Sequence, residues 1–342
     1  NADMYNVAIG HNAGGDVTTG TNNTLIGGLA GDALTTGSDN TVLGKSALSA
    51  GVASFYNTAI GHNALAADTT GRLSVAVGRN ALAAQNNTSS ANMYNTAVGS
   101  SAGLSVTTAI ENTLIGGLAG DAITTGNSNV AVGYLSLSAN TTGASNVGIG
   151  VIALDANTTG SDNVGMGRGA LGANTTASNN TAVGGLALSS NTTGSNNVAF
   201  GAEALSTNTL GSKSTAIGRE ALRQQNFTSA TDSYNTAVGY RAGLLVTTGI
   251  SNTLIGGLAG DALTDADENV AVGVSALGAD TLGSKSTAVG KSALAQQNFT
   301  SATETFNTAV GHFAGYSVTT GVQNTLIGGL AGDAQTTASN NT

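Results

Sequence analysis

Three histidines are the residues of this chain best suited to bind a transition metal or to act as general bases. His11, His62 and His312 each directly follow a glycine, and the same position elsewhere holds residues as different as Lys45 and Val274. A position that varies in this way is typical of a side chain facing solvent. The imidazoles lie far apart in the sequence and lack carboxylates at ligand spacing. We therefore predict no metal centre, no cofactor and no catalytic site, so the chain is not expected to be an enzyme.

A glycine–aspartate motif is similar to the nonapeptides that bind calcium in some β-rolls. It has the sequence Gly-Gly-Leu-Ala-Gly-Asp and begins at residues 27, 116, 256 and 328. Calcium requires several oxygen ligands in one place, whereas the four acidic residues are widely separated along the chain: Asp32, Asp121, Asp261 and Asp333. Tight turns at the glycines are the favoured interpretation.

Basic and aromatic residues gather in and just before three segments, residues 79–99, 219–239 and 291–311. Exposed aromatic and cationic groups on protruding loops are typical of receptor contacts. The candidate receptor-binding residues, for a host-surface glycan or protein, are Arg72, Arg79, Tyr94, Lys213, Arg219, Phe227, Tyr234, Lys285, Lys291, Phe299 and Phe306. The favoured alternative is structural: these residues adjust the twist or interlock subunits, and the cations pair with Asp232, Glu220 or Glu304.

Paired threonines suggest a different kind of surface. Thr-Thr occurs twelve times, from Thr18-Thr19 to Thr336-Thr337, which raises the hypothesis of an ice- or crystal-binding face. Adjacent residues of an extended segment point to opposite sides, so only one threonine of each pair would face outward. Threonines that satisfy turn backbone are the more common case.

The composition excludes several classes of protein. Only 8% of the 342 residues are charged, 40% are hydrophobic, 50 are glycine, and proline, cysteine and tryptophan are absent. The formal net charge of -9 argues against binding to nucleic acid, and no apolar run is long enough for a transmembrane helix. The apolar content is too high for a disordered chain, so repetition must order it.

The repeat has the form Asn-[Thr/Val]-Ala-[Val/Ile]-Gly, with alanine three residues after the glycine. The spacing is 17 residues, except for three steps of 21 residues that end at Gly99, Gly239 and Gly311. The motif glycines are Gly10, Gly27, Gly44, Gly61, Gly78, Gly99, Gly116, Gly133, Gly150, Gly167, Gly184, Gly201, Gly218, Gly239, Gly256, Gly273, Gly290, Gly311 and Gly328. These nineteen copies predict one continuous solenoid array over residues 1–342, with three long coils at 79–99, 219–239 and 291–311.

Short β-branched runs bounded by glycine predict strands rather than helices. The expected fold is an all-β parallel β-solenoid with two short strands in each coil, separated by turns at the motif glycine and at the Thr-Thr-Gly segment. Alternation along a strand places Asn, Ala and Gly on one face and the branched residues on the other. We place the small residues in the lumen, although the reverse assignment stays open.

Stacked coils should build two structural columns. The Asn side chains are expected to form a hydrogen-bonded ladder, represented by Asn6, Asn23, Asn57 and Asn95. The motif glycines form the second structural column, represented by Gly10, Gly27, Gly61 and Gly99. The outward Val/Ile/Thr columns would then form a large apolar surface that a monomer does not tolerate. We therefore predict a homo-oligomer.

Both ends of the sequence fall within a repeat. It begins with Met4-Tyr5-Asn6 after three residues, matching Met93-Tyr94-Asn95, and it ends where a further Ala-Val-Gly would start. Solenoids normally carry atypical capping repeats, so we expect an array truncated at both ends.

The repeats resemble the head repeats of trimeric autotransporter adhesins (YadA-like heads). The resemblance rests on Val7-Ala8-Ile9-Gly10, Thr58-Ala59-Ile60-Gly61 and Val75-Ala76-Val77-Gly78, each with alanine three residues later, and it extends over all nineteen coils. It implies a left-handed parallel β-roll in a homotrimer on a bacterial outer surface. Similar repeats occur in bacteriophage tail fibres.

The expected function is therefore that of a structural and adhesive region, the head or shaft of an extracellular attachment fibre at a cell or virion surface. Three alternatives stay open: a bacteriophage tail fibre of the same fold, an end-to-end extracellular filament, and an ice- or crystal-surface binding module.

Overall fold

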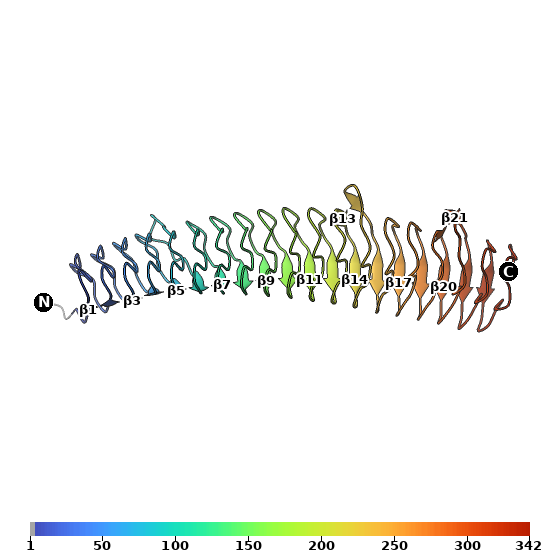
Figure 1. The fold of residues 1–342 in the computed structure, drawn as a ribbon, viewed down its shortest axis with the longest axis horizontal. Helices are drawn as coiled ribbons and strands as arrows, with labels where there is room; N and C mark the ends of the chain where they lie inside the picture. The colour runs from blue at the N-terminus through green and yellow to red at the C-terminus, as the bar shows by residue number, and fades with distance from the viewer. Residues whose placement is uncertain (1–3) are drawn as a thin grey trace. The chain divides into compact units, whose positions relative to one another are not determined.

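The computed structural model describes residues 4–342, which consist of strands and turns without any helix. No described segment is therefore a helix of the length and hydrophobicity needed to cross a membrane. The chain divides into two compact units, Asn1–Gly169 and Ala170–Thr342. The predicted all-β parallel solenoid is confirmed in both (Figure 1).

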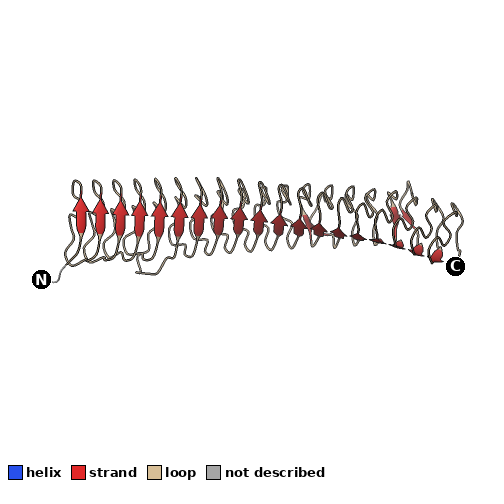
Figure 2. Cartoon of the chain, turned by 90° about the horizontal axis from the view of Figure 1, so that it is seen from below, coloured by secondary structure: helices blue, strands red, loops and turns tan. Residues whose placement is uncertain are grey.

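The first unit contains one three-residue strand in each coil. Consecutive strands pair in parallel with a shift of one repeat, as in Val130↔Val147 and Val132↔Ile149, and Figure 2 shows them side by side in a row. The strands are β1 (Val7–Ile9), β2 (Thr24–Ile26), β3 (Thr41–Leu43), β4 (Thr58–Ile60), β5 (Val75–Val77), β6 (Thr96–Val98), β7 (Thr113–Ile115), β8 (Val130–Val132), β9 (Val147–Ile149) and β10 (Val164–Met166).

The second unit continues the pattern and adds two short strand pairs. The three-residue strands are β11 (Thr181–Val183), β12 (Val198–Phe200), β14 (Thr215–Ile217), β16 (Thr236–Val238), β17 (Thr253–Ile255), β18 (Val270–Val272), β20 (Thr287–Val289), β22 (Thr308–Val310) and β23 (Thr325–Ile327). The two-residue strands are β13 (Gly211–Ser212), β15 (Thr231–Asp232), β19 (Gly283–Ser284) and β21 (Thr303–Glu304).

The prediction of two strands in every coil is wrong. Most coils hold a single strand, and the turn predicted at the Thr-Thr segment is confirmed: the backbone nitrogens of Thr18, Thr19 and Gly20 all donate to the Thr35 carbonyl oxygen, at 3.0, 3.2 and 3.1 Å. Three successive donors meet one acceptor, a geometry that a strand ladder does not allow. The threonine hydroxyl adds to it, as Thr124 Oγ1 donates to the Thr141 carbonyl at 3.1 Å.

The central residue of each strand points into the coil, which settles the orientation that the sequence leaves open. Ala59, Ala76 and Ala131 are fully buried, while the residues on either side of them are partly exposed. The strand centres, most of them alanine, therefore face the interior, and the branched residues on either side form the outer face of the main sheet.

Stacking brings the motif glycines into close contact, which no other residue would permit. These glycines have φ between +127° and +145°, and a Cβ atom added to Gly116 would lie 2.5 Å from the Gly133 carbonyl oxygen. Both the backbone conformation and the space therefore require glycine at this column.

The glycine–aspartate motif supplies space for a leucine. Leu25 is a large residue at the centre of its strand. A Cβ atom added to Gly14 would lie 2.7 Å from the Leu25 side chain, and one added to Gly31 would lie 3.0 Å from it. Leu25 is fully buried between these glycines. The glycine therefore compensates for the larger core residue.

The asparagines four residues before the motif glycines form a continuous internal ladder within each unit. The Asn23 backbone nitrogen donates to Asn6 Oδ1 at 2.8 Å, and the Asn57 backbone nitrogen donates to Asn40 Oδ1 at 3.0 Å. The Asn57 Nδ2 also donates to the Gly71 carbonyl at 2.9 Å. Each amide thus joins neighbouring coils and satisfies a buried carbonyl.

Serine replaces asparagine in the coil before each long coil, and a buried glutamine restores the missing contacts. Gln225 Nε2 donates to Ser214 Oγ at 2.8 Å, and Asn235 Nδ2 donates to Gln225 Oε1 at 2.9 Å. The glutamine amide thereby bridges the ladder across the longer loop. The same contacts join Ser74, Gln85 and Asn95 and Ser286, Gln297 and Asn307.

Gln85 also faces a buried carboxyl group. Its Nε2 donates to Asp68 Oδ2 at 2.8 Å, and burial raises the pKa of the Asp68 carboxyl above its ordinary value despite this bond. The second unit has Asn208 at one equivalent position, where its Oδ1 accepts from Gln225 Nε2 at 3.3 Å, and Asp280 at the other, where its Oδ2 accepts from Gln297 Nε2. A neutral amide therefore suits this position.

Asn129→Ala should weaken the first unit locally. The Asn129 Oδ1 accepts from the Asn146 backbone nitrogen at 3.0 Å, and a buried donor left unpaired costs about 1–3 kcal/mol. Hydrogen exchange of the Asn146 amide should become faster. Thr125→Ala, at an exposed residue of the same coil, is the control, and equal exchange in both variants would contradict the ladder's role.

Asp68→Asn should stabilise the first unit at neutral pH and reduce its pH dependence. Because burial raises the folded pKa of Asp68 above the ordinary aspartate value, the folded chain binds the proton more readily than the unfolded chain, and wild-type stability rises as the pH falls from neutral towards that ordinary value. Denaturant midpoints measured over this range should rise less steeply in the variant. Asp162→Asn, at an exposed carboxylate, should keep the wild-type slope, and an unchanged slope in Asp68→Asn would disprove the assignment.

Candidate functional site

The long coils of the second unit carry a second short ladder outside the main sheet. β13 pairs with β15 through Gly211↔Thr231, and β19 pairs with β21 through Gly283↔Thr303. Figure 1 shows β13 on the opposite side of the coil from β14. The additional residues of the long coils are thus directed away from the face that carries the main sheet.

A lysine, an acid and an exposed aromatic ring meet beside β15. Lys213 Nζ lies 2.7 Å from Asp232 Oδ2 and 3.0 Å from the Tyr234 hydroxyl, and 5.1 Å from the centre of the Tyr234 ring. The hydrogen bond to Asp232 raises the pKa of Lys213. Tyr234 is 56% exposed, so this cluster presents a ring with a fixed charge pair beside it.

The next long coil repeats this cluster with related residues. Lys285 Nζ forms an ion pair with Glu304 and lies 5.4 Å from the centre of the Phe306 ring. The bond to Glu304 raises the pKa of Lys285, and Phe306 is 49% exposed. Lys285 and Glu304 border an open groove of about 230 Å³, which is also lined by Asp267, Glu268, Ser284, Ala302 and Thr303.

The long coil of the first unit has a related but different cluster. The Arg72 guanidinium lies 4.7 Å from the centre of the Phe55 ring, and the backbone of Arg72 bridges to Phe55 and to Asn92. Asn92 Nδ2 donates to the Tyr94 hydroxyl at 3.1 Å, and Tyr94 is 52% exposed. In the first unit the cation therefore lies against the partly exposed Phe55, while the exposed Tyr94 is held by an amide.

A buried glutamate organises the remaining cations of residues 203–241. Arg219 Nη2 lies 2.8 Å from Glu220 Oε1, and Arg241 Nε lies 2.7 Å from Glu220 Oε2. The hydrogen bond from Arg241 lowers the pKa of Glu220. In the adjacent coil Arg223 Nε lies 3.0 Å from Glu203 Oε2. The expected pairing of cations with Asp232, Glu220 and Glu304 is therefore confirmed.

Phe227 and Phe299 are not surface groups. They are 5% and 7% exposed, and a Cβ atom on Gly211 would lie 2.7 Å from the Phe227 ring. This corrects the interpretation of these two residues as receptor contacts: the rings fill space at the base of the long-coil loops, which is the structural alternative.

The other candidate residues do not join one site. Arg79 and Lys291 are exposed, and Lys291 Nζ lies 5.9 Å from the centre of the Phe313 ring. The three histidines are exposed as well. Among residues 4–342, no three His, Asp or Glu side chains lie close enough together to hold a metal ion.

Several partners of these clusters were missed by the sequence reasoning. Phe55, Tyr240 and Phe313 each lie against a cation, which for Tyr240 is Arg241, and Gln225 holds the polar ladder together beneath the loop. These contacts could have been found from the position of each residue relative to its motif glycine. Residues at the same distance from successive motif glycines become neighbours when the coils stack.

Comparison with known proteins does not extend this description. The chain matches no protein-family model, and no curated protein is significantly similar to it in sequence. The fold and its repeats define the chain as a β-solenoid repeat protein.

Phe227→Ala should destabilise the long coil at residues 219–239, because removing a buried ring costs about 3–5 kcal/mol. Hydrogen exchange of residues 226–233 should become much faster. Tyr234→Asn is the control, since Tyr234 is exposed and has φ of +50°, which asparagine tolerates. If Phe227→Ala leaves exchange unchanged, the ring does not hold the loop.

Proposed function

We propose that this chain is the repetitive head or shaft of an extracellular attachment fibre in which three copies pack side by side. The proposal agrees with the resemblance of the repeats to trimeric autotransporter heads. The fibre acts mechanically: backbone ladders run along the stack, and contacts between subunits stiffen it.

The observation that carries the proposal is the apolar column directly before the motif glycines. In the first unit this column consists of Ile9, Ile26, Leu43, Ile60, Val77, Val98, Ile115, Val132, Ile149 and Met166, and in the second of Val183, Phe200, Ile217, Val238, Ile255, Val272, Val289, Val310 and Ile327. None of these side chains is buried within the chain. An apolar surface of this length is typical of a face that packs against other subunits.

The long coils are the proposed receptor contacts. Tyr94, Tyr234 and Phe306 are exposed and each lies near a charged or polar partner. Rings of this kind stack on sugar faces or anchor protein contacts. Lys213 and Lys285 hold two of these rings beside fixed charges, so binding requires little additional ordering.

The threonine pairs favour this proposal over an ice-binding module. Hydroxyl groups of the first threonine in a pair donate to carbonyl groups of the next coil, as in Thr107, Thr141 and Thr192. In these three pairs only the second threonine is exposed. A single column of hydroxyl groups does not form a two-dimensional template.

The oligomeric state tests the proposal. Light scattering should give the mass of three chains, and Ile217→Glu with Ile255→Glu should dissociate them, because burying unpaired carboxylates is costly. The control is Thr176→Glu with Thr193→Glu, which adds the same charge at exposed turn residues and should leave the mass unchanged. A monomeric wild-type chain would overturn the proposal.

A further inference from the structure

The long coils share a tripeptide whose exposed groups are not among the proposed receptor contacts. Each contains the tripeptide Asn-X-Thr eight residues after its motif glycine: Asn86-Asn87-Thr88, Asn226-Phe227-Thr228 and Asn298-Phe299-Thr300. Asn-X-Ser/Thr is the acceptor sequence for N-linked sugars when it lies on a surface loop. The three copies fall at equivalent places.

The asparagine side chains are held in one orientation. Asn226 Oδ1 accepts from Thr209 Oγ1 at 2.6 Å, Asn298 Oδ1 accepts from Thr281 Oγ1 at 3.1 Å, and Asn86 Oδ1 accepts from Thr69 Oγ1 at 2.9 Å. Among residues 4–342, none of the three Nδ2 atoms has a hydrogen-bond partner. The oxygen therefore serves the fold, and the nitrogen, which is the atom a sugar would occupy, is free.

The acceptor segments are accessible. Asn226 and Asn298 are exposed, Asn86 is partly exposed, and the threonines at 88, 228 and 300 are exposed. Buried Phe227 and Phe299 anchor the middle of two segments. The three residues that follow each of these phenylalanines are all exposed. The asparagine and the threonine of both tripeptides therefore face solvent.

Six other copies of the tripeptide differ in this respect, whereas two copies in ordinary coils, at Asn179 and Asn340, also have an exposed asparagine. The asparagines at 140, 157, 174 and 191 are fully buried, and Asn140 Nδ2 donates to the Gly143 carbonyl at 2.9 Å. The amide nitrogens of Asn22 and Asn87 donate to Asp39 and Met93. Accessibility of the nitrogen therefore separates the long-coil tripeptides from these six.

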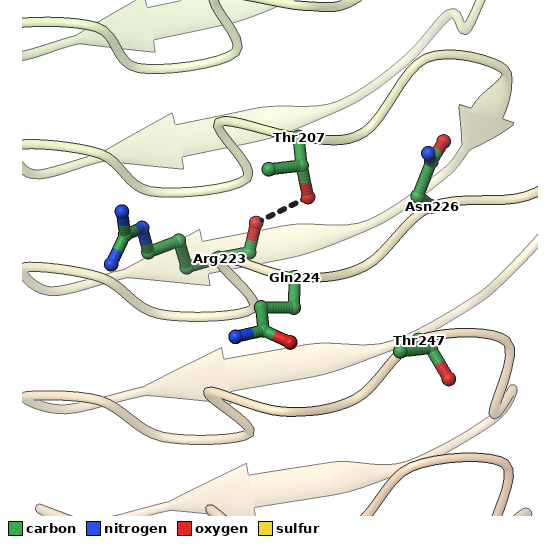
Figure 3. Close-up of a pocket in the computed structure, with 5 residues that line it drawn as sticks. All are labelled: Thr207, Arg223, Gln224, Asn226 and Thr247. Atoms are coloured by element: carbon green, nitrogen blue, oxygen red, sulfur yellow. Dashed lines mark hydrogen bonds between the residues drawn. The ribbon is translucent and has the colours of Figure 1, made fainter.

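The surroundings of Asn226 have room for a sugar. An open groove of about 450 Å³ is lined by Thr207, Arg223, Gln224, Asn226 and Thr247, and Figure 3 shows Asn226 at its edge. Hydroxyl, amide and guanidinium groups are suitable partners for sugar hydroxyl groups.

We propose that Asn226 and Asn298, and to a lesser extent Asn86, are N-glycosylation sites. The donor is a sugar activated by a diphosphate at its anomeric carbon, on a nucleoside or a lipid. The Nδ2–C1 bond forms, the C1–O bond breaks, the diphosphate leaves with the electron pair, and a base of the transferase takes one amide proton. The carbonyl oxygen keeps its bond to the threonine, so the coil is unchanged. The proposal goes beyond attachment and does not depend on the trimer.

Peptide mass spectrometry of the protein from the cells that produce it tests the proposal. Peptides containing Asn226 and Asn298 should carry added sugar mass, and those containing Asn140 and Asn157 should not. Absence of sugar at both Asn226 and Asn298, or equal modification of Asn140, would overturn the proposal.

Variants identify the linked atom and the recognition sequence. Asn226→Gln and Thr228→Ala should each remove the sugar from this segment and leave Asn298 modified. Persistence of the added mass in Asn226→Gln would place the sugar on a hydroxyl group and overturn the assignment.

In vitro, folded chain with UDP-glucose and a purified Asn-X-Ser/Thr-specific glucosyltransferase should gain glucose at Asn226 and Asn298 but not at Asn140, whereas urea-unfolded chain should react at all three. Folded chain that gains none at the first two would show that they are inaccessible.

Discussion

The requirement that each coil lie directly over the next at a fixed register is the constraint on which the rest of this protein depends. The backbone approaches so closely at the motif glycines that a Cβ atom on Gly116 would overlap the Gly133 carbonyl. The buried Asn ladder reinforces the register, since each amide bonds the backbone of its neighbour, as Asn57 does to Ser74. A shift of one residue would place polar and apolar side chains on the wrong faces. Local geometry and internal hydrogen bonds therefore specify the same stacking.

The interior accommodates sequence variation by exchanging volume or hydrogen-bond partners between adjacent coils. A strand-centre leucine such as Leu25 is matched by glycine at positions 14 and 31, and a serine in the Asn column is matched by a glutamine, as in Ser214 and Gln225. Because a close-packed interior leaves no room for unmatched changes, these substitutions occur in compensating sets. The four-residue insertions are tolerated because the glutamine carries the polar ladder past them.

Chemical variety is consequently confined to the outside. The main sheet presents columns of branched side chains, and the long coils place Lys213, Asp232 and Tyr234, or Lys285, Glu304 and Phe306, on a different side of the coil. The two sides of the coil therefore differ in chemistry. The apolar face is suited to subunit packing, and the loops carry ordered charge pairs, exposed rings and free asparagine amides that are suited to recognition and modification. Each loop is supported from below by buried groups such as Phe227.

The sequence by itself determined the solenoid, its coil boundaries and its polar ladder, because a strict 17-residue spacing with glycine and asparagine in fixed columns permits few other folds. It also indicated the cation partners Asp232, Glu220 and Glu304. It indicated turns at the Thr-Thr segments, but it did not determine whether Ala or Val faced inward, that most coils hold a single strand, or that Phe227 and Phe299 were buried. Those outcomes depend on how wide a coil closes and on which residues of neighbouring coils meet. Only the stacked structure brings Gln225 beneath Ser214, or frees the amide nitrogen of Asn226, because these contacts join residues that a linear pattern does not relate.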